Sequence, residues 1–152
     1  MKKKRASWDE YFMKIVHDVS ERSTCLRRSV GAILVKDKQI ISTGYNGPPR
    51  GTPHCDEKGG CLREKLKVPS GEREELCRAS HAEENAIVQA ARHGISTNGS
   101  TLYIKNFPCS KCAKLLINAG IVEVVYANPY NAGLSAELLE EAKIKVRRVK
   151  LD

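Results

Sequence analysis

The sequence predicts an α/β protein, a three-layer α/β/α sandwich around a mixed five-stranded sheet. Strand-like and helix-like segments alternate from residue 101 onward, which is typical of parallel strands joined by right-handed helical crossovers. Two earlier apolar, β-branched runs separated by three charged residues predict an antiparallel hairpin in the same sheet. With 152 residues and 41% hydrophobic content, the chain has the size of one domain with one core, so we expect a single domain over residues 1–152.

The first part of the chain supplies one helix and the hairpin. Apolar residues recur at helical spacing over residues 7–21, which predicts an amphipathic helix with its apolar face inward. The hairpin strands are residues 30–35 and 39–44, and the charged residues 36–38 form the turn between them. The helix therefore covers one face of the sheet that the hairpin begins.

The second part of the chain supplies three helices and three strands. Residues 80–92 are rich in Ala, Glu and Gln and are followed by Gly94, which favours a helix with a glycine at its C-terminal end. The other predicted elements are a strand at 101–105, a helix at 109–119 ended by Gly120, a strand at 122–127, a helix at 135–143 and a strand at 145–150.

One segment does not fit this alternation. Residues 47–79 show no clear periodicity and are too long for an ordinary connection, so the segment is functional, disordered or held by a crosslink. It contains Cys55, Cys61 and Cys77, and these cysteines favour the crosslink. We call residues 47–79 the insertion.

Charge and hydropathy bear on the partners of the protein. The net charge of +8 favours an anionic partner, and phosphate on a nucleotide or on a nucleic acid satisfies it equally. The alternative is that the basic clusters near both ends of the sequence are solvated surface. The basic residues 2–5 are followed by Trp8, Asp9 and Glu10 rather than by an uninterrupted apolar stretch, and no stretch reaches the length of a membrane span. We therefore expect a cytoplasmic protein without a membrane partner, in which cysteines bind metal or do chemistry rather than form disulfides.

Four residues form the pattern that carries chemistry. His81 and Glu83 make an H-x-E motif, and Cys109 and Cys112 follow a proline in a P-C-x-x-C motif. A catalytic zinc takes three nitrogen or sulfur ligands and keeps its fourth position for water, and His81, Cys109 and Cys112 supply that number. The cysteine pair lies at a predicted helix start, where backbone N–H groups and the helix dipole favour thiolates.

This pattern predicts a hydrolytic deamination. Bound zinc lowers the pKa of its water from about 16 to near 7, and a carboxylate that is not a ligand can move the protons. We predict that Glu83 is this carboxylate and that the water attacks C4 of a cytosine and releases ammonia, which is the known signature of zinc deaminases. Taken singly, the histidine could be a packed or surface residue and the cysteines a structural zinc site or a redox pair, but the combined spacing favours catalytic zinc.

The sequence resembles the deoxycytidylate (dCMP) deaminase family of the cytidine deaminase superfamily over nearly its whole length. Besides the two motifs, the resemblance rests on residues 30–32, 85–87 and 119–121 and on the Gly-Tyr-Asn-Gly segment 44–47. It implies a cytidine deaminase-like fold and conversion of dCMP to dUMP and ammonia, a reaction that feeds dTMP synthesis.

The resemblance also implies roles for residues around the substrate. Asn46 is expected to hydrogen-bond the deoxyribose, and Ala82 and Tyr130 are expected to line the nucleotide pocket. Arg27 or Arg28 is a suitable phosphate partner because a guanidinium group matches phosphate geometry. The alternative for the arginines and Asn46 is an ordinary surface or turn role.

Allosteric members of the family sense dCTP and dTTP, with magnesium on the triphosphate, through a loop similar to residues 44–51. The resemblance gives Gly44, Tyr45, Gly47 and Arg50 as effector-binding residues, whereas a tight turn after the second strand explains the same glycines without an effector. The family also implies a homo-oligomer, with a hexamer expected and with a pocket that a second subunit can complete.

Four cysteines are left after the catalytic pair, and four is the number that a structural zinc site needs. They are Cys25, Cys55, Cys61 and Cys77, with His54 as an alternative ligand, since relatives carry a second zinc in this region, sometimes with histidine. Such a site would order an insertion whose polar sequence cannot order itself by packing. The alternative is that some of these cysteines are buried as small apolar residues or are free thiols.

Two rival functions use the same motifs. A tRNA adenosine deaminase shares the zinc chemistry and also suits a basic surface. The Gly-Tyr-Asn-Gly segment and the insertion favour a nucleotide, so we do not expect a nucleic-acid partner. A non-catalytic zinc module that binds nucleic acid is the other class, but it has no use for Glu83 beside a ligand.

Overall fold

The computed structural model describes residues 1–130 and 132–150. Its centre is a five-stranded sheet with the strand order β2-β1-β3-β4-β5. Strand β1 pairs antiparallel with both β2 and β3, whereas β3, β4 and β5 are parallel to one another. The strands are β1 (Gly31–Lys36), β2 (Gln39–Tyr45), β3 (Thr101–Asn106), β4 (Glu123–Asn128) and β5 (Lys145–Arg148). The predicted mixed sheet, with an antiparallel hairpin on parallel strands, is confirmed.

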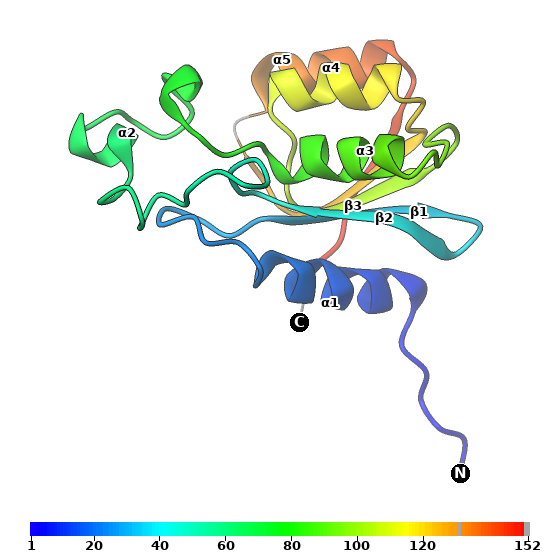
Figure 1. Ribbon diagram of the computed structural model, residues 1–152. Helices are drawn as coiled ribbons and strands as arrows, with labels where there is room; N and C mark the ends of the chain where they lie inside the picture. Colours follow the sequence, from blue (N-terminus) through cyan, green and yellow to red (C-terminus); the bar gives the residue numbers. More distant parts are fainter. Residues whose placement is uncertain (131, 151–152) are drawn as a thin grey trace.

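Helices cover both faces of this sheet (Figure 1). Helix α1 (Trp8–Ser20) lies alone on one face. The opposite face carries α3 (Ala82–Arg92), α4 (Ser110–Asn118) and α5 (Gly133–Glu141). The three-layer α/β/α arrangement predicted from the alternation of elements is therefore confirmed.

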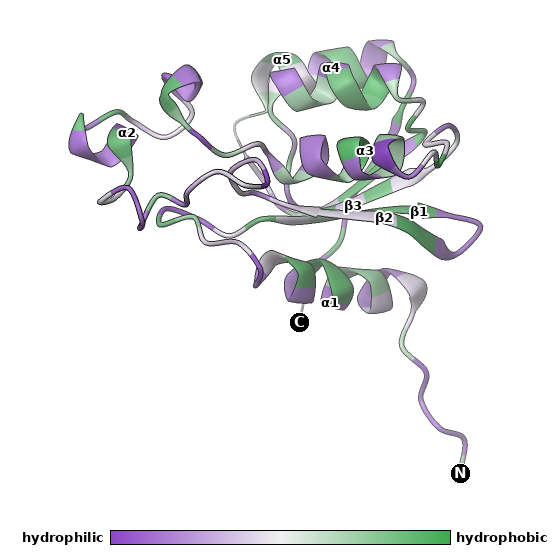
Figure 2. Ribbon diagram, in the orientation of Figure 1, coloured by the Kyte–Doolittle hydropathy of each residue, from purple (hydrophilic) through white to green (hydrophobic). Residues whose placement is uncertain are grey.

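The two faces of the sheet have separate apolar cores. Along β1, Ile33 and Val35 point into the core below α1, while Ala32 and Leu34 point into the core below the other three helices. Successive side chains of a strand alternate between faces, so a strand buried on both sides is a continuous apolar run. Figure 2 shows hydrophobic and hydrophilic residues alternating along α1, as expected for a helix with one face on the sheet.

Helix α3 lies very close to the edge strand β2, and Gly44 makes this approach possible. A Cβ atom at Gly44 would lie 2.3 Å from the carbonyl oxygen of Ala82 and 2.4 Å from the backbone nitrogen of Ala86. No side chain fits between strand and helix at this point. The first turn of α3 is thereby fixed against the end of β2.

An ion-pair network ties α1 to the edge strand β5. The carboxylate of Asp9 accepts hydrogen bonds from the Tyr103 hydroxyl at 2.8 Å and from Arg147 Nη1 at 2.9 Å. Arg147 in β5 also donates from Nε to Glu123 Oε1 in β4 at 2.5 Å. One arginine thus joins the first helix to two neighbouring parallel strands.

The insertion projects from one end of the sheet and contains two short helices that the sequence did not predict (Figure 1). They are α2 (Leu62–Lys65) and the 3-10 helix η1 (Glu74–Leu76), each of a single turn, too short to produce a periodic pattern. The base of the insertion is closed by backbone hydrogen bonds in both directions between Gly47 and Ser80, at 3.2 and 2.9 Å. The insertion therefore begins and ends at neighbouring points beside the sheet.

The last two elements end earlier than predicted. Helix α5 ends at Glu141 rather than at residue 143, because Lys143 has a φ of 59° and leaves the helical conformation. Strand β5 ends at Arg148 rather than at residue 150. None of the helices in the described ranges has the length and apolar character needed to cross a membrane.

Candidate active site

Two helix starts carry the side chains of the predicted metal site. His81 is the residue that immediately precedes α3, and Cys109 holds the same position before α4. Cys112 lies in the first turn of α4, which follows directly on β3. The tight packing of α3 on β2 and the short connection from β3 to α4 bring both helix starts to the same end of the sheet.

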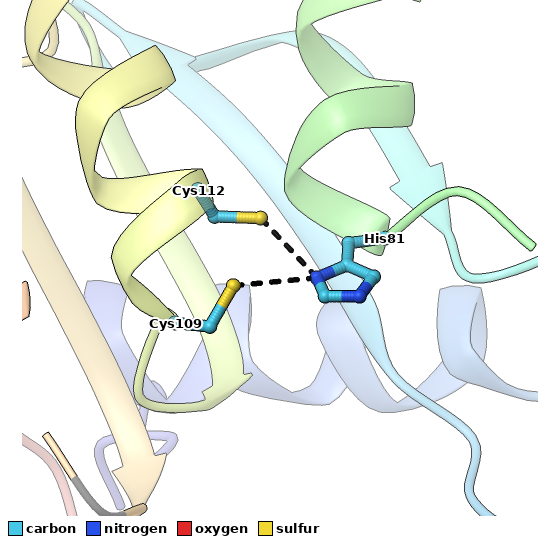
Figure 3. A group of neighbouring side chains, drawn as sticks. All are labelled: His81, Cys109 and Cys112. Atoms are coloured by element: carbon cyan, nitrogen blue, oxygen red, sulfur yellow. Dashed lines mark hydrogen bonds between the residues drawn. The ribbon is translucent and has the colours of Figure 1, made fainter. Parts of the chain in front are cut away.

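The three side chains converge, as Figure 3 shows. The Nδ1 atom of His81 lies 3.5 Å from the sulfur of Cys109 and 3.4 Å from that of Cys112. One ligand atom from each residue lies within 4.8 Å of the other two. One nitrogen and two sulfurs at this spacing fit the three protein ligands of a catalytic zinc, whose fourth position is taken by water. The structure thus brings together the three residues that the sequence singled out.

The charge state of the thiols also suits a metal. A hydrogen bond from Cys112, together with the contact with His81, lowers the pKa of Cys109 to about 3, so that Cys109 is a thiolate at neutral pH. The same hydrogen bond raises the pKa of Cys112. A divalent cation between them favours the ionised form of both.

Glu83 is the carboxylate nearest in sequence to His81, and its side chain is shielded from water. The residue lies in the first turn of α3 and is 5% exposed. Burial raises the pKa of its carboxyl group to about 7, against an opposing effect of the neighbouring His81. A group with this pKa can both hold and release a proton at neutral pH, as a general acid–base catalyst must.

A second carboxylate links the two helix starts. Glu84 Oε1 accepts a hydrogen bond from the backbone nitrogen of His81 at 3.0 Å, which satisfies a free N–H group at the start of α3. The same oxygen lies 3.2 Å from Nζ of Lys111, in the first turn of α4. Neither residue was predicted to have a role, although a glutamate three residues after a helix start is a recognisable capping signal.

A cavity of about 130 Å³ opens beside these groups and is lined by residues of the domain and of the insertion. Its lining includes His81, Ala82, Glu83, Asn46 and Tyr130, all of which were predicted to lie at the site.

Three arginines also line the cavity. Arg27 donates to the carbonyl of Val68 at 3.3 Å, and its Nη1 atom is buried without a hydrogen-bond partner in the described structure. Arg28 contacts Ser70 and lies 5.6 Å from the ring centre of Tyr130. Arg63 of the insertion has a buried, unpartnered Nε atom in the same described structure. Arg63 was missed because the insertion offers no pattern that places its side chains.

Asn46 has a structural role that its sequence context did not indicate. Its side-chain oxygen accepts from the backbone nitrogen of Val30 at 2.8 Å, and its side-chain nitrogen donates to the carbonyl of Arg28 at 3.0 Å. The amide therefore holds the segment that carries the arginines and keeps one lone pair and one N–H for a ligand. Its predicted contact with deoxyribose stays a prediction.

The four predicted effector residues are spread over different environments. Gly44 is explained by the contact of β2 with α3. The carbonyl of Tyr45 accepts a hydrogen bond from Asn85, and Arg50 donates to Gln89 at 2.9 Å. Gly47 is the one of the four that lines the cavity described above.

The four remaining cysteines all line this cavity, Cys25 from the segment after α1 and the other three from the insertion. Burial raises the pKa of the Cys55 thiol, and the nearby thiols of Cys61, Cys77 and Cys25 raise it further. In the described residues, however, His81, Cys109 and Cys112 are the one group of potential ligands with atoms within 4.8 Å of one another. His54, the alternative ligand, has its Nδ1 atom 2.5 Å from the hydroxyl of Thr24.

Comparison with known proteins agrees with this geometry. Residues 6–128 match the model of the cytidine and deoxycytidylate deaminase zinc-binding region. The chain belongs to this deaminase family. The deaminase is 42% identical over 149 residues to ComE operon protein 2 of Bacillus subtilis, a match that covers 97% of this chain and 74% of the relative.

Two other similar proteins are named as deoxycytidylate (dCMP) deaminases. The deoxycytidylate deaminase of Schizosaccharomyces pombe is 41% identical over 145 residues, covering 95% of this chain but only 44% of the yeast protein. The crystal structure of the dCMP deaminase from cyanophage S-TIM5 in complex with dCMP and dUMP superposes with a TM-score of 0.79 at 30% identity, covering 97% of this chain and 100% of the phage chain. The predicted family and fold are confirmed. This deaminase therefore spans less than half of the yeast relative but the full length of the phage chain.

Proposed function

We propose that this chain is a zinc-dependent deaminase that converts dCMP and water to dUMP and ammonia. The proposal rests on one observation: a buried carboxyl group with a pKa near 7, Glu83, adjoins a nitrogen and two sulfurs that converge within 4.8 Å. The relatives named deoxycytidylate deaminase and the phage enzyme bound to dCMP and dUMP support the same substrate.

His81, Cys109 and Cys112 would hold the zinc, which when bound acidifies water and supplies positive charge at the reacting carbon. Glu83 takes a proton from the water that adds to C4 of the cytosine and gives it to ring nitrogen N3. It then takes a second proton from the hydroxyl group now on C4 and passes it to the exocyclic amine, which leaves as ammonia while C4 becomes a carbonyl. The near-complete burial of Glu83 excludes bulk water from competing for these protons.

The arginines along the cavity fit the phosphate end of a nucleotide. Arg27 and Arg63 carry buried N–H groups without a partner in the described part of the chain, and a buried donor without an acceptor is costly. A phosphate oxygen supplies that acceptor, with charge-assisted hydrogen bonds that neutral deoxycytidine cannot make. Arg27 keeps the phosphate role that its charge suggested, and Arg63 joins it.

The test is ammonia release measured in parallel on dCMP, deoxycytidine, dCTP and a tRNA anticodon hairpin. We expect dCMP to have the highest kcat/KM. Preference for the tRNA hairpin would replace this proposal with the adenosine deaminase, and a fully zinc-loaded protein inactive on all four substrates would refute deamination.

We also propose a second, structural zinc at Cys25, Cys55, Cys61 and Cys77, with His54 as the alternative ligand. The mutual effect of the four thiols on the pKa of Cys55 supports their proximity. Metal binding would bring such thiols together, because structural zinc sites commonly order their own ligands. Metal analysis should return two zinc ions per chain, and one zinc per chain in a fully active preparation would exclude the second site.

Regulation and assembly follow from the family resemblance. We propose that dCTP and dTTP, each with magnesium on the triphosphate, bind near residues 44–51, and that the chain forms a homo-oligomer, expected to be a hexamer. The substrate-saturation curve measured with each triphosphate tests the first point: an unchanged curve refutes it. A molar mass in solution equal to that of one chain refutes the second.

A further inference from the structure

His81 presents its two ring nitrogens to two different partners. Nδ1 lies 3.5 and 3.4 Å from the sulfurs of Cys109 and Cys112. Nε2 lies 3.7 Å from a carboxylate oxygen of Glu74. A nitrogen that binds a metal must offer a lone pair, so in a neutral histidine that binds through Nδ1 the proton is on Nε2. That proton faces Glu74.

Glu74 comes from the insertion rather than from the elements that build the zinc site. It opens the 3-10 helix η1, where its carbonyl accepts a hydrogen bond from the Cys77 nitrogen at 2.9 Å. Its side chain lines the same cavity as Glu83 and is 32% exposed, while that of His81 is 29% exposed. The two groups therefore meet where water screens their interaction only in part.

The neighbouring acid has a different partner. Glu75 pairs with Arg73, and both side chains are mostly exposed. Of the ion pairs formed by the described residues, the contact with His81 is the one that involves Glu74. Two adjacent glutamates in one short helix thus have separate partners, one on the surface and one at the metal site.

We propose that Glu74 is a positioning residue for the catalytic zinc. Its carboxylate attracts the Nε2 proton of His81, which keeps the Nδ1 lone pair directed at the metal position and makes the ring a stronger ligand. Histidines that bind metals commonly donate their second ring N–H to such a carboxylate, and loss of that partner weakens metal binding by about 10- to 100-fold. The inference rests on the proposed function, because it presupposes that His81 binds zinc.

The same contact couples the insertion to the reaction. Glu74 is three residues from Cys77, one of the proposed ligands of the second zinc. Any metal that orders Cys77 therefore also orders η1 and the carboxylate beside His81. The insertion contributes a part of the active site through this contact, in addition to forming a wall of the cavity.

Cobalt(II) binding tests the proposal without reference to turnover. The full chain is stripped of metal and titrated with Co(II) under competition by a chelator, and the ligand-field absorption separates a site of one nitrogen and two sulfurs from an all-sulfur site. At the site of one nitrogen and two sulfurs, we expect E74A to bind Co(II) about tenfold more weakly than the wild type. This is the lower end of the range for loss of a histidine's carboxylate partner, because the contact is 3.7 Å long. The matched control E75A, which loses only the surface pair with Arg73, should stay within about twofold of the wild type, since exposed pairs contribute little.

The outcomes separate the two proposals. Wild-type Co(II) affinity in E74A, or an equal loss in E75A, overturns the positioning role even if the enzyme deaminates dCMP rapidly. If E74A does not fold, the isosteric E74Q decides, because it removes the charge while keeping an oxygen acceptor: an affinity between those of wild type and a tenfold loss supports the proposal, and an unchanged affinity overturns it. A wild-type protein that binds Co(II) tightly but releases no ammonia from dCMP refutes the proposed function and leaves the role of Glu74 in metal binding standing.

Discussion

Replacing Glu83 by glutamine should abolish turnover and, at the same time, stabilise the metal-stripped protein at neutral and alkaline pH. Burial raises the pKa of this carboxyl group from its ordinary value of 4.5 to about 7. In the unfolded chain the group loses its proton near pH 4.5, but in the folded chain it keeps the proton until about pH 7. Below pH 4.5 both states are protonated and the group has no effect on stability. As the pH rises to 7 the unfolded state releases its proton first, so folding becomes less favourable.

The two pKa values set the magnitude. At about 1.4 kcal/mol per pH unit, the gap between 4.5 and 7 corresponds to a destabilisation of roughly 3.5 kcal/mol well above pH 7. A glutamine does not ionise and avoids this penalty. The free energy of unfolding of E83Q relative to the wild type should therefore rise by about 2.5 kcal/mol between pH 5 and pH 8.

Urea unfolding of both metal-stripped proteins at pH 5 and pH 8 measures this difference, and the zinc-loaded proteins are assayed for ammonia release from dCMP. We expect kcat to fall by at least about 10²- to 10⁴-fold, the usual contribution of a general acid–base group, while zinc content is unchanged. If the difference in free energy of unfolding between E83Q and the wild type does not change with pH, burial does not raise the pKa of Glu83. Retained turnover would show that it does not move the protons.

Three further predictions address packing, ion pairing and substrate binding. Gly44→Ala should lower stability by about 2 kcal/mol or more, measured by thermal unfolding, because its Cβ would lie 2.3 Å from a backbone oxygen of α3, whereas the control Gly47→Ala meets nothing closer than 3.7 Å. The hydrogen bond from Arg147 lowers the pKa of Asp9, so Asp9 stabilises the fold above its unfolded pKa and this effect is lost as the pH falls. Asp9→Asn should thus cost about 1 kcal/mol at pH 7 and progressively less as the pH falls below the unfolded pKa of 3.8, measured by urea unfolding, and a cost independent of pH would contradict the assignment. Arg27→Ala should raise KM for dCMP about tenfold and leave KM for deoxycytidine unchanged, and equal effects on both substrates would rule out a phosphate contact.

The sheet and its helices were predictable because their signals are local and repetitive. The alternation of strands and helices after residue 100 and the apolar run of β1 follow from burial on both faces, which the structure shows at Ile33 and Leu34. The metal site was predictable because its chemistry demands particular residue types at short spacing. Its convergence needed no long-range knowledge beyond the fact that helix starts follow strand ends in such folds.

The insertion could not be predicted in the same way. Its two single-turn helices have no periodic face, and the position of Arg73, with a φ of 48°, is not encoded by a residue type that favours the left-handed region. The contact of Glu74 with His81 and the direction of Arg63 into the cavity depend on how the loop returns to Ser80. Such contacts arise from tertiary packing, so only a structure places them.

The pairing of Asp9 with Arg147 has a consequence for how the protein is made. The two residues are 138 positions apart in the chain, so Asp9 emerges from the ribosome long before its partner is synthesised. Until the last strand joins the sheet, α1 can rest on the hairpin and β3 through apolar contacts and the hydrogen bond between Asp9 and Tyr103, but without its ion pair. Closure of this end of the domain is therefore a late folding event, and the nascent chain exposes that edge of the sheet to chaperones and to other chains until then.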